Sequence, residues 1–168
     1  MMILNNNPSK FLNKCNSKKG SWKQGVFTPK FPNKCIGNMF PTYRSSWEQK
    51  IFTFMDENKN VEKWGSEILK IPYKCQLDNK VHTYFVDIFA LIRDNNGNLQ
   101  KYAIEIKPFT QTQPPKPPKK MSIKANKNYL YSIHTYTKNT DKWNALQNYC
   151  AANQIIFKII TEDNFSFK

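Results

Sequence analysis

A chain of 168 residues has room for one domain with a single hydrophobic core and does not require a second. Its 26 Lys and Arg against 12 Asp and Glu give a formal net charge of +14, which attracts polyanions and makes nucleic acid the first partner to consider. Anionic membranes attract basic surfaces too. However, no apolar run approaches the roughly 20 residues of a membrane span, and the start of the chain lacks an apolar signal core. These features predict a soluble intracellular protein with no membrane partner.

Residues 1–40 form a basic segment without acidic side chains. Their seven lysines, three prolines and weak periodicity predict an extended arm that lies on the body or on DNA, although a solvated tail fits the charge as well. Lys18 and Lys19 are the DNA contacts expected in this arm. Its aromatic residues offer faces for packing or for stacking on bases: Trp22, Phe27, Phe31 and Phe40.

The folded body is expected over residues 41–168 and opens with a helix. Apolar side chains recur at helical spacing from Ser45 to about Asn58, which predicts an amphipathic helix there. Residues 61–73 carry the pattern of a first strand.

A β-hairpin is the clearest element of the chain. Two apolar runs, Val81–Ile92 and Leu99–Lys107, flank a loop over residues 94–98 whose Asp, Asn and Gly tolerate positive φ. Val86 faces Ile106 across the hairpin, so this side of the two strands is predicted to be core.

The remainder of the chain adds a loop, a helix and a strand. Residues 113–120 hold four prolines and three lysines, which predicts a stiff, basic loop leaving the body. Residues 121–136 are ambiguous between helix and loop. Thr140 or Asp141 is expected to cap a helix through Cys150, and Ile155–Ile160 a final strand. The order α-β-β-β-α-β predicts an α/β domain with a mixed sheet flanked by helices. The loop lysines expected to contact DNA are Lys116, Lys119 and Lys120.

Acidic and basic side chains gather on the other side of the hairpin. A turn centred on Asn96 places Asp87 opposite Glu105 and Phe85 opposite Lys107. Facing carboxylates with side-chain roots about 5 Å apart repel each other unless a proton or a cation lies between them. A solvated charged face is the alternative, but such faces usually oppose an acid with a base. The like-charge pairing therefore favours a functional site.

A divalent metal resolves the repulsion between Asp87 and Glu105. Carboxylate oxygens suit Mg²⁺ or Mn²⁺, which activate water and stabilise charge on a phosphate under attack. Lys107 would stabilise the same charge, or orient and deprotonate the water, because burial beside a metal lowers the pKa of a lysine. These roles together predict phosphodiester hydrolysis.

A third acid is expected beside this pair. Glu48 on the first helix is one candidate, but the run Ser45 to Glu48 equally fits a capping box, in which Glu48 only bonds the helix start. Glu67 is the secondary candidate. His82 and His134 receive no role. The four cysteines lie far apart in the sequence, which predicts free thiols with neither disulfides nor zinc.

The pattern of Asp87 followed by Glu105-Ile106-Lys107 on the next strand resembles the active site of the PD-(D/E)XK nuclease superfamily. Val86 stands where that superfamily often has proline. The resemblance implies a restriction-endonuclease-like core.

Longer matches extend the resemblance from about Gly25 to Asp163. They resemble the head completion nucleases of T4-like phages and are similar to the endonuclease subunit of Tn7-type transposases. That resemblance implies a virion-assembly role on packaged DNA or the portal region, after packaging and before tail attachment, in the host cytoplasm or with the virion. It also implies that Glu48 joins Asp87 and Glu105 as a metal ligand. The matching segments are Gly25–Pro29, Tyr43–Glu48, Trp64–Glu67, Ile71–Tyr73, Glu105–Pro108 and Ile160–Glu162.

Two other functions fit the same residues. A structural head or connector protein would keep the fold and bind DNA or protein without cleaving, since a fold does not guarantee its chemistry. A cleaving subunit of a transposition or restriction system would share every catalytic residue with the phage enzyme. The intact set of Asp87, Glu105 and Lys107 argues against the structural protein.

Overall fold

The computed structural model describes residues 24–120 and 122–163. Within these ranges, none of the helices combines the length and the apolar character needed to cross a bilayer. The elements in chain order are β1 (Gly25–Val26), η1 (Pro32–Lys34), β2 (Thr42–Tyr43), α2 (Ser46–Glu57), β3 (Val61–Ser66), β4 (Lys70–Lys74), β5 (Val81–Phe85), β6 (Ile88–Arg93), β7 (Leu99–Ile106), α3 (Phe109–Thr112), α4 (Ile123–Asn153) and β8 (Ile155–Ile160).

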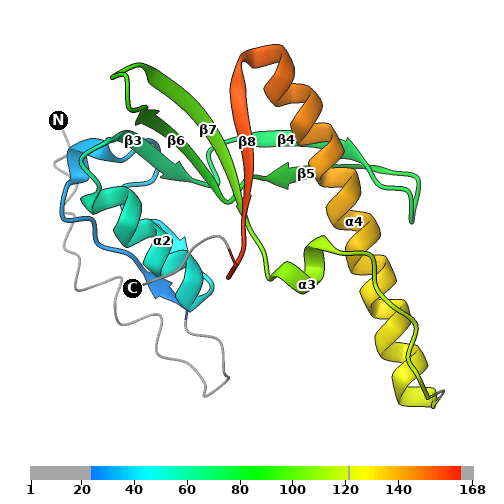
Figure 1. Cartoon of the computed structure of the whole chain (residues 1–168). Helices are drawn as coiled ribbons and strands as arrows, with labels where there is room; N and C mark the ends of the chain where they lie inside the picture. The colour runs from blue at the N-terminus through cyan, green and yellow to red at the C-terminus, as the bar shows by residue number, and fades with distance from the viewer. Residues whose placement is uncertain (1–23, 121, 164–168) are drawn as a thin grey trace, which may run out of the picture.

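A four-stranded sheet in the order β3-β6-β7-β8 forms the centre of the molecule (Figure 1). Its first three strands are antiparallel and β8 runs parallel to β7, so the sheet is mixed as predicted. The predicted hairpin register is confirmed within β6 and β7, because Ile88 pairs with Ile104 and Arg93 pairs with Leu99. Gly97 provides the positive φ of the turn, at 83°.

Helices cover both faces of this sheet. On one face, Phe52 and its neighbours on α2 pack with Trp64 of β3 and Ile104 of β7. On the other face, Leu146 of α4 packs with Ala103 of β7. Successive strand side chains point to opposite faces, so the register that sends Ile104 toward α2 sends Glu105 toward α4.

Both long apolar segments of the sequence break into two strands. Residues 61–73 were expected to form one strand, but β3 and β4 are separate elements with Glu67 between them in a left-handed conformation (φ 55°). The run Val81–Ile92 likewise divides into β5 and β6. Strands β4 and β5 pair with each other in a second sheet, where Phe85 lies opposite Lys70. The predicted pairing of Phe85 with Lys107 is therefore wrong, because β5 leaves the main sheet before reaching β7.

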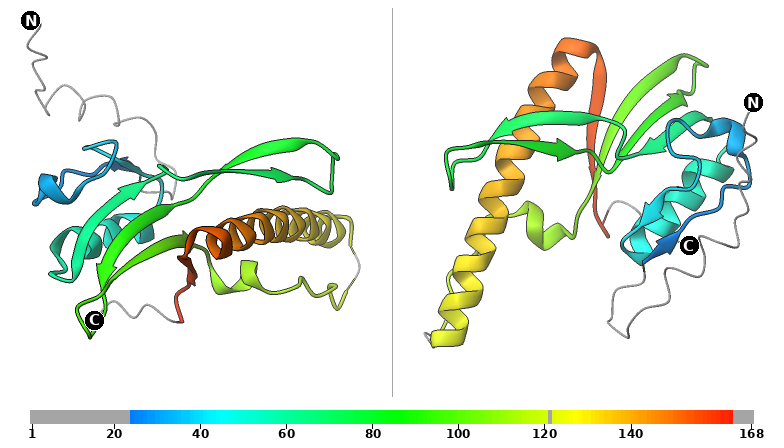
Figure 2. Two further views of the ribbon diagram at one scale, coloured as in Figure 1. Left: turned by 90° about the horizontal axis from the view of Figure 1, so that it is seen from above. Right: turned by 180° about the vertical axis from the view of Figure 1, so that it is seen from behind.

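Helix α4 is longer than the sequence pattern indicated. The Ser122 side chain caps it by accepting a hydrogen bond from the Ala125 amide, so the ambiguous stretch up to residue 136 is helical. Thr140 and Asp141 lie inside the helix, and the predicted cap at these residues is wrong. Asp141 is buried and accepts hydrogen bonds from the Gln76 backbone amide (2.8 Å) and side-chain amide (2.6 Å), which ties α4 to the β4–β5 connection. The first turns of α4 project from the body, as two further views show (Figure 2).

The described part of the basic N-terminal segment, residues 24–40, packs against the body. The Phe27 ring lies edge-on to Phe52 (centroids 5.7 Å apart) and to Trp64 (5.8 Å apart). The buried Asp56 carboxylate accepts hydrogen bonds from the Lys30 and Phe31 amides. Lys18, Lys19 and Trp22 lie outside the described residues.

Candidate active site

An open pocket of about 440 Å³ lies where β5, β7 and α4 meet. It holds the three hairpin residues that the sequence singled out together with residues from four other segments of the chain. Its lining residues are Arg44, Glu67, Thr83, Tyr84, Phe85, Asp87, Glu105, Lys107 and Lys142.

Glu105 is the most deeply buried acid of the pocket, with 1% of its surface exposed. One carboxylate oxygen accepts a hydrogen bond from the Tyr84 phenol, and the other lies 2.8 Å from the Lys107 ammonium. Burial, and next the charge of Glu105, raise the pKa of the Tyr84 phenol. Tyr84 therefore stays protonated and remains a hydrogen-bond donor to Glu105.

Asp87 is held at the pocket by a hydrogen bond and not by the expected strand pairing with Glu105. It precedes β6 and forms no ladder pair with Glu105; its carboxylate accepts a hydrogen bond from the Ile106 backbone amide (2.8 Å). This bond holds Asp87 beside the end of β7. Burial, and next the negative charge of Glu105, raise the pKa of Asp87 to about 7. The two acids therefore repel each other, as the sequence led us to expect.

Lys107 lies between the two acids. Its Nζ is 2.8 Å from Glu105 Oε1 and 3.7 Å from Asp87 Oδ2. Burial alone would lower the pKa of Lys107, but the charges of Asp87 and Glu105 outweigh burial and raise it. A lowered pKa of Lys107 was expected from the sequence, for a lysine buried beside a metal. In the protein alone, Lys107 is a firmly charged cation, which favours charge stabilisation over proton abstraction.

The two candidates for a third acid occupy different positions. Glu48 makes half of the expected capping box: its amide donates to the Ser45 hydroxyl (3.1 Å), but its carboxylate accepts from the amide of Arg44 (2.8 Å), one residue before the N-cap. Its charge nevertheless acts on both Asp87 and Lys107. Glu67 lines the pocket and forms an ion pair with the Arg44 guanidinium. The Glu67 amide also donates to the Asp87 carbonyl (3.3 Å).

Four of the pocket residues were not singled out from the sequence: Arg44, Thr83, Tyr84 and Lys142. In an unbroken strand, Tyr84 and Asp87 would point to opposite faces, whereas the break between β5 and β6 brings both to Glu105. Lys142 comes from α4, and its ammonium lies 5.3 Å from the centre of the Tyr84 ring. Arg44 precedes α2, and its guanidinium forms an ion pair with Glu67 at the pocket. No local pattern in the sequence marks these contacts.

The donor set fits a divalent cation with a preference for oxygen ligands. Asp87 and Glu105 converge on one position, their mutual repulsion raises the pKa of Asp87, and the ammonium of Lys107 already bridges them. A site that stabilises one cation between two carboxylates has the chemistry that Mg²⁺ or Mn²⁺ needs.

The other residues considered from the sequence lie elsewhere. Lys116, Lys119 and Lys120 are exposed in the segment between α3 and α4 and do not line this pocket. His82 pairs with Asp78 (2.8 Å) outside the pocket, and His134 is exposed on α4. The cysteines in the described ranges are free thiols: Cys35, Cys75 and Cys150.

Comparison with known proteins agrees with this geometry. The head completion nuclease of Enterobacteria phage T4 is 41% identical over 140 residues, which cover 83% of this chain and 91% of that protein. Residues 58–162 match the family described as TnsA-like endonuclease N terminal. The match includes Asp87, Glu105 and Lys107, and the mixed sheet between helices is the restriction-endonuclease-like fold that this family implies. The chain therefore belongs to the TnsA-like endonuclease family.

Proposed function

We propose that this protein is a metal-dependent DNA endonuclease that hydrolyses phosphodiester bonds in the pocket around Asp87, Glu105 and Lys107. The observation that carries the proposal is the arrangement of two carboxylates around one ammonium group at the base of an open pocket. Membership of an endonuclease family supports the same chemistry.

Asp87 and Glu105 would hold the metal, with Mg²⁺ the expected ion and Mn²⁺ a substitute. When bound, such an ion supplies activation of a water molecule and stabilisation of charge on the phosphate. Lys107 adds a fixed positive charge at the same place. Tyr84 fixes the orientation of the Glu105 carboxylate through its hydrogen bond. The third carboxylate is Glu48, as the family resemblance implies, with Glu67 the secondary candidate.

Two basic residues at the pocket wall are suited to the DNA backbone. Arg44 and Lys142 both line the pocket, and they come from different elements: Arg44 precedes α2 and Lys142 lies on α4. Arg44 is held in place by Glu67, and Lys142 lies over the Tyr84 ring. Both would position a phosphate against the acids.

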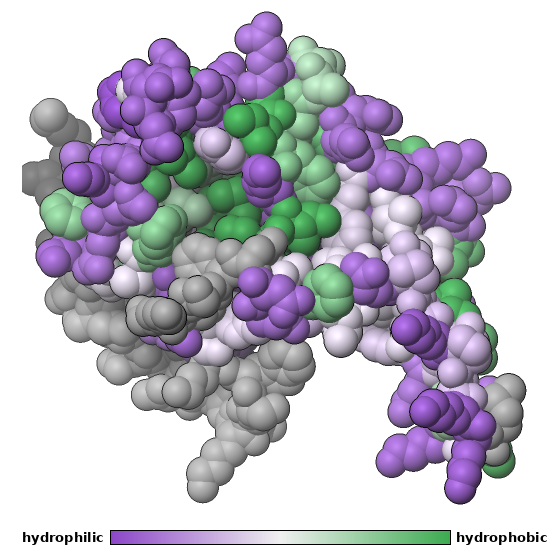
Figure 3. Space-filling view, viewed as in Figure 1, coloured by the Kyte–Doolittle hydropathy of each residue, from purple (hydrophilic) through white to green (hydrophobic). Residues whose placement is uncertain are grey.

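The projecting end of α4 and the segment beside it offer a longer DNA surface. No acidic residue occurs from position 106 to position 140. Strongly hydrophilic side chains stand out on this projection in the space-filling view, among paler and a few apolar ones (Figure 3). Lysines on this surface would pair with DNA phosphates, and the contact would release counterions bound to the DNA. The exposed lysines concerned are Lys116, Lys119, Lys120, Lys124 and Lys127.

The biological setting that we propose is phage head completion. The relative in phage T4 carries that name, and the enzyme would act on DNA after packaging and before tail attachment, with head or portal proteins as partners. It would work in the host cytoplasm during phage assembly or with the virion. The match to the TnsA-like family supports a second candidate, the cleaving subunit of a transposition system. A non-catalytic connector protein would have no need for a buried acid paired with lysine.

Cleavage of supercoiled plasmid tests the nuclease proposal. We expect nicking with Mg²⁺ or Mn²⁺ and none with EDTA, and complete loss in Glu105→Gln, which keeps the shape of the side chain. Glu62→Gln is the matched control, because Glu62 pairs with Arg93 on the surface away from the pocket. Plasmid binding without metal-dependent nicking by the wild type would instead favour the structural connector.

DNA binding at several salt concentrations tests the proposed surface. Changing three lysines of the projection to glutamine should weaken binding and flatten its dependence on salt, since each lost phosphate contact removes about 0.9 from the slope. A control with the same loss of charge elsewhere should change the slope less. The two triple variants are Lys116, Lys119 and Lys120 to Gln and, as control, Lys59, Lys101 and Lys158 to Gln. Equal slopes for the two would refute the surface.

A further inference from the structure

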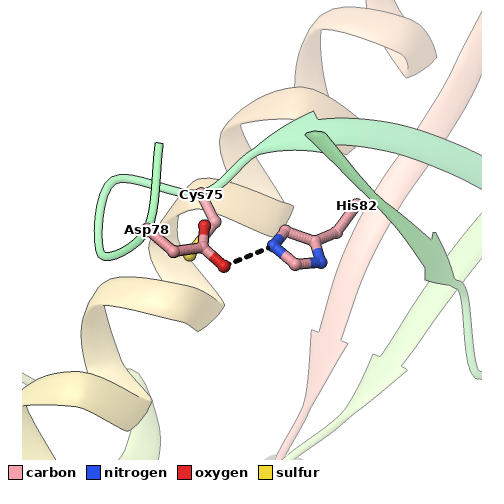
Figure 4. A group of neighbouring side chains, drawn as sticks. All are labelled: Cys75, Asp78 and His82. Atoms are coloured by element: carbon pink, nitrogen blue, oxygen red, sulfur yellow. Dashed lines mark hydrogen bonds and ion pairs between the residues drawn. The ribbon is translucent and has the colours of Figure 1, made fainter. Parts of the chain in front are cut away.

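We propose that the connection between β4 and β5 carries a second metal site, for Zn²⁺, formed by the Cys75 thiolate, the Asp78 carboxylate and the His82 imidazole. One ligand atom from each residue lies within 4.8 Å of the other two. Figure 4 shows the Asp78 carboxylate placed next to both the Cys75 sulfur and the His82 ring. This site is separate from the pocket around Glu105, whose lining contains none of the three residues.

The backbone between Cys75 and Lys80 holds the ligands together. The Cys75 amide donates to the Lys80 carbonyl (2.9 Å), and the Asn79 amide donates back to the Cys75 carbonyl (2.9 Å). Asn79 adopts the left-handed conformation (φ 60°) that this tight reversal requires. The turn places Asp78 above Cys75, and Lys80 leads into β5, where His82 pairs with Tyr73 of β4.

The contacts around the ligands orient them further. Asp78 Oδ2 lies 2.8 Å from His82 Nε2, and the Tyr73 ring packs against the His82 ring with centroids 5.7 Å apart. Asp141 of α4 binds Gln76, the residue after Cys75. The site therefore sits on a turn that is already fixed to the body, and little ordering remains to be done when an ion binds.

The chemistry of the three groups selects zinc over magnesium. A thiolate and an imidazole are softer ligands than carboxylates alone, and Zn²⁺ accepts sulfur, nitrogen and oxygen in one tetrahedral site. With zinc bonds of about 2.0–2.3 Å, the ion would lie between the three ligand atoms and replace the direct contact of Asp78 Oδ2 with His82 Nε2. Asp78 and His82 are exposed, so their side chains can shift to admit the ion, while Asp78 Oδ1 stays bound to the Lys80 amide (3.1 Å) and the buried Cys75 stays in place. Water would fill the fourth position from the solvent side.

No role for His82 and no zinc at the cysteines were predicted from the sequence, since no two cysteines lie close together in it. The spacing that matters here is Cys75, two residues, Asp78, three residues, His82. Bound zinc would fix the shape of the β4–β5 turn. Since β5 carries Tyr84 to Glu105, this site would stabilise a strand that builds the active site.

Cobalt titration of the metal-free full-length protein tests the proposal. Co²⁺ bound to a thiolate gives a sulfur-to-metal charge-transfer absorption band that carboxylate ligands do not give. We expect one equivalent of Co²⁺ to produce the band and Zn²⁺ to abolish it by displacement. Glu105→Gln should retain the band in full, so that a failure of the proposed nuclease site and a failure of this site remain distinguishable.

Single substitutions assign the band to its ligands. Asp78→Asn and His82→Gln change exposed residues and should each weaken Co²⁺ binding at least tenfold, while Cys75→Ser should abolish the band. Cys35→Ser is the matched control and should retain it. Absence of the band in the folded wild-type protein would overturn the site. Its persistence at full affinity in the Asp78 and His82 variants would overturn it as well.

Discussion

The hydrogen bond from Tyr84 to Glu105 allows a sharp test of how the active site is built. Tyr84→Phe removes one hydroxyl group and keeps the ring, which is 3% exposed and packed in the core beneath α4. The substitution leaves one oxygen of the buried Glu105 carboxylate without its donor. The Lys107 contact to the other oxygen remains.

The size of the effect follows from the burial of both partners. A hydrogen bond to a charged group contributes about 1.5–3 kcal/mol. Each ~1.4 kcal/mol of lost transition-state stabilisation slows a reaction tenfold. If the whole loss falls on catalysis, kcat/KM for plasmid nicking should fall about 10- to 100-fold at saturating Mg²⁺. Metal affinity should fall as well, because a freely rotating carboxylate is a poorer ligand.

Steady-state nicking kinetics with a Mg²⁺ titration measure both effects. Tyr73→Phe is the control, since Tyr73 lies on the paired strand β4 and its ring contacts His82 instead of the acids. A rate within twofold of the wild type would show that Glu105 needs no orienting donor. A loss as complete as that of Glu105→Gln would show that Tyr84 acts on the DNA itself.

Three other perturbations give distinct expectations. Asp56→Ala should lower the free energy of unfolding, measured in urea, by on the order of 3 kcal/mol, because the amides of residues 30–31 lose their buried acceptor; an unchanged value would show that this segment adds nothing to stability. In EDTA, the contribution of Asp87 to the stability of the wild type should fall as pH rises from about 4 to about 7. The raised pKa of Asp87 lets the folded state hold a proton that the unfolded state releases in this range. Thermal melts should show that Asp87→Asn lacks this trend. Mg²⁺ titrations of nicking by Glu48→Gln and Glu67→Gln should identify the third ligand. We expect the Mg²⁺ concentration required for nicking to rise at least tenfold in the Glu48 variant and less in the Glu67 variant.

Local pattern was sufficient to predict which residues of the hairpin lie together. The turn at Gly97 and the alternation along β6 and β7 fix which residues of the hairpin face each other, and both features can be read from consecutive residues. Glu105 and Lys107 therefore lie together on the face expected. The helix over α2 and the strand β8 were predicted for the same reason, since each is a short segment of uniform pattern.

Features that depend on contacts between residues far apart in the sequence could not be predicted. The break at Asp87 arises because its side chain bonds the Ile106 amide and its carbonyl accepts from Glu67, residues 19 and 20 positions away. The start of α4 was misplaced because its first turns project from the body and have no apolar stripe. Asp141 resembled a helix cap in sequence, yet it serves as a buried acceptor for Gln76.

The length of helix α4 sets a distance between the active-site pocket and the projecting end of the molecule. Lys142 stands at the active-site pocket, and Ser122 marks the far end of the same unbroken helix. At 1.5 Å per residue, these positions are about 30 Å apart along the axis, which is close to the length of nine base pairs of duplex at 3.4 Å each. If DNA follows the projection, a contact with Lys124 fixes the cut about one helical turn away, and inserting residues into α4 would move it. The length of α4 would then set the distance along DNA between this contact and the cut.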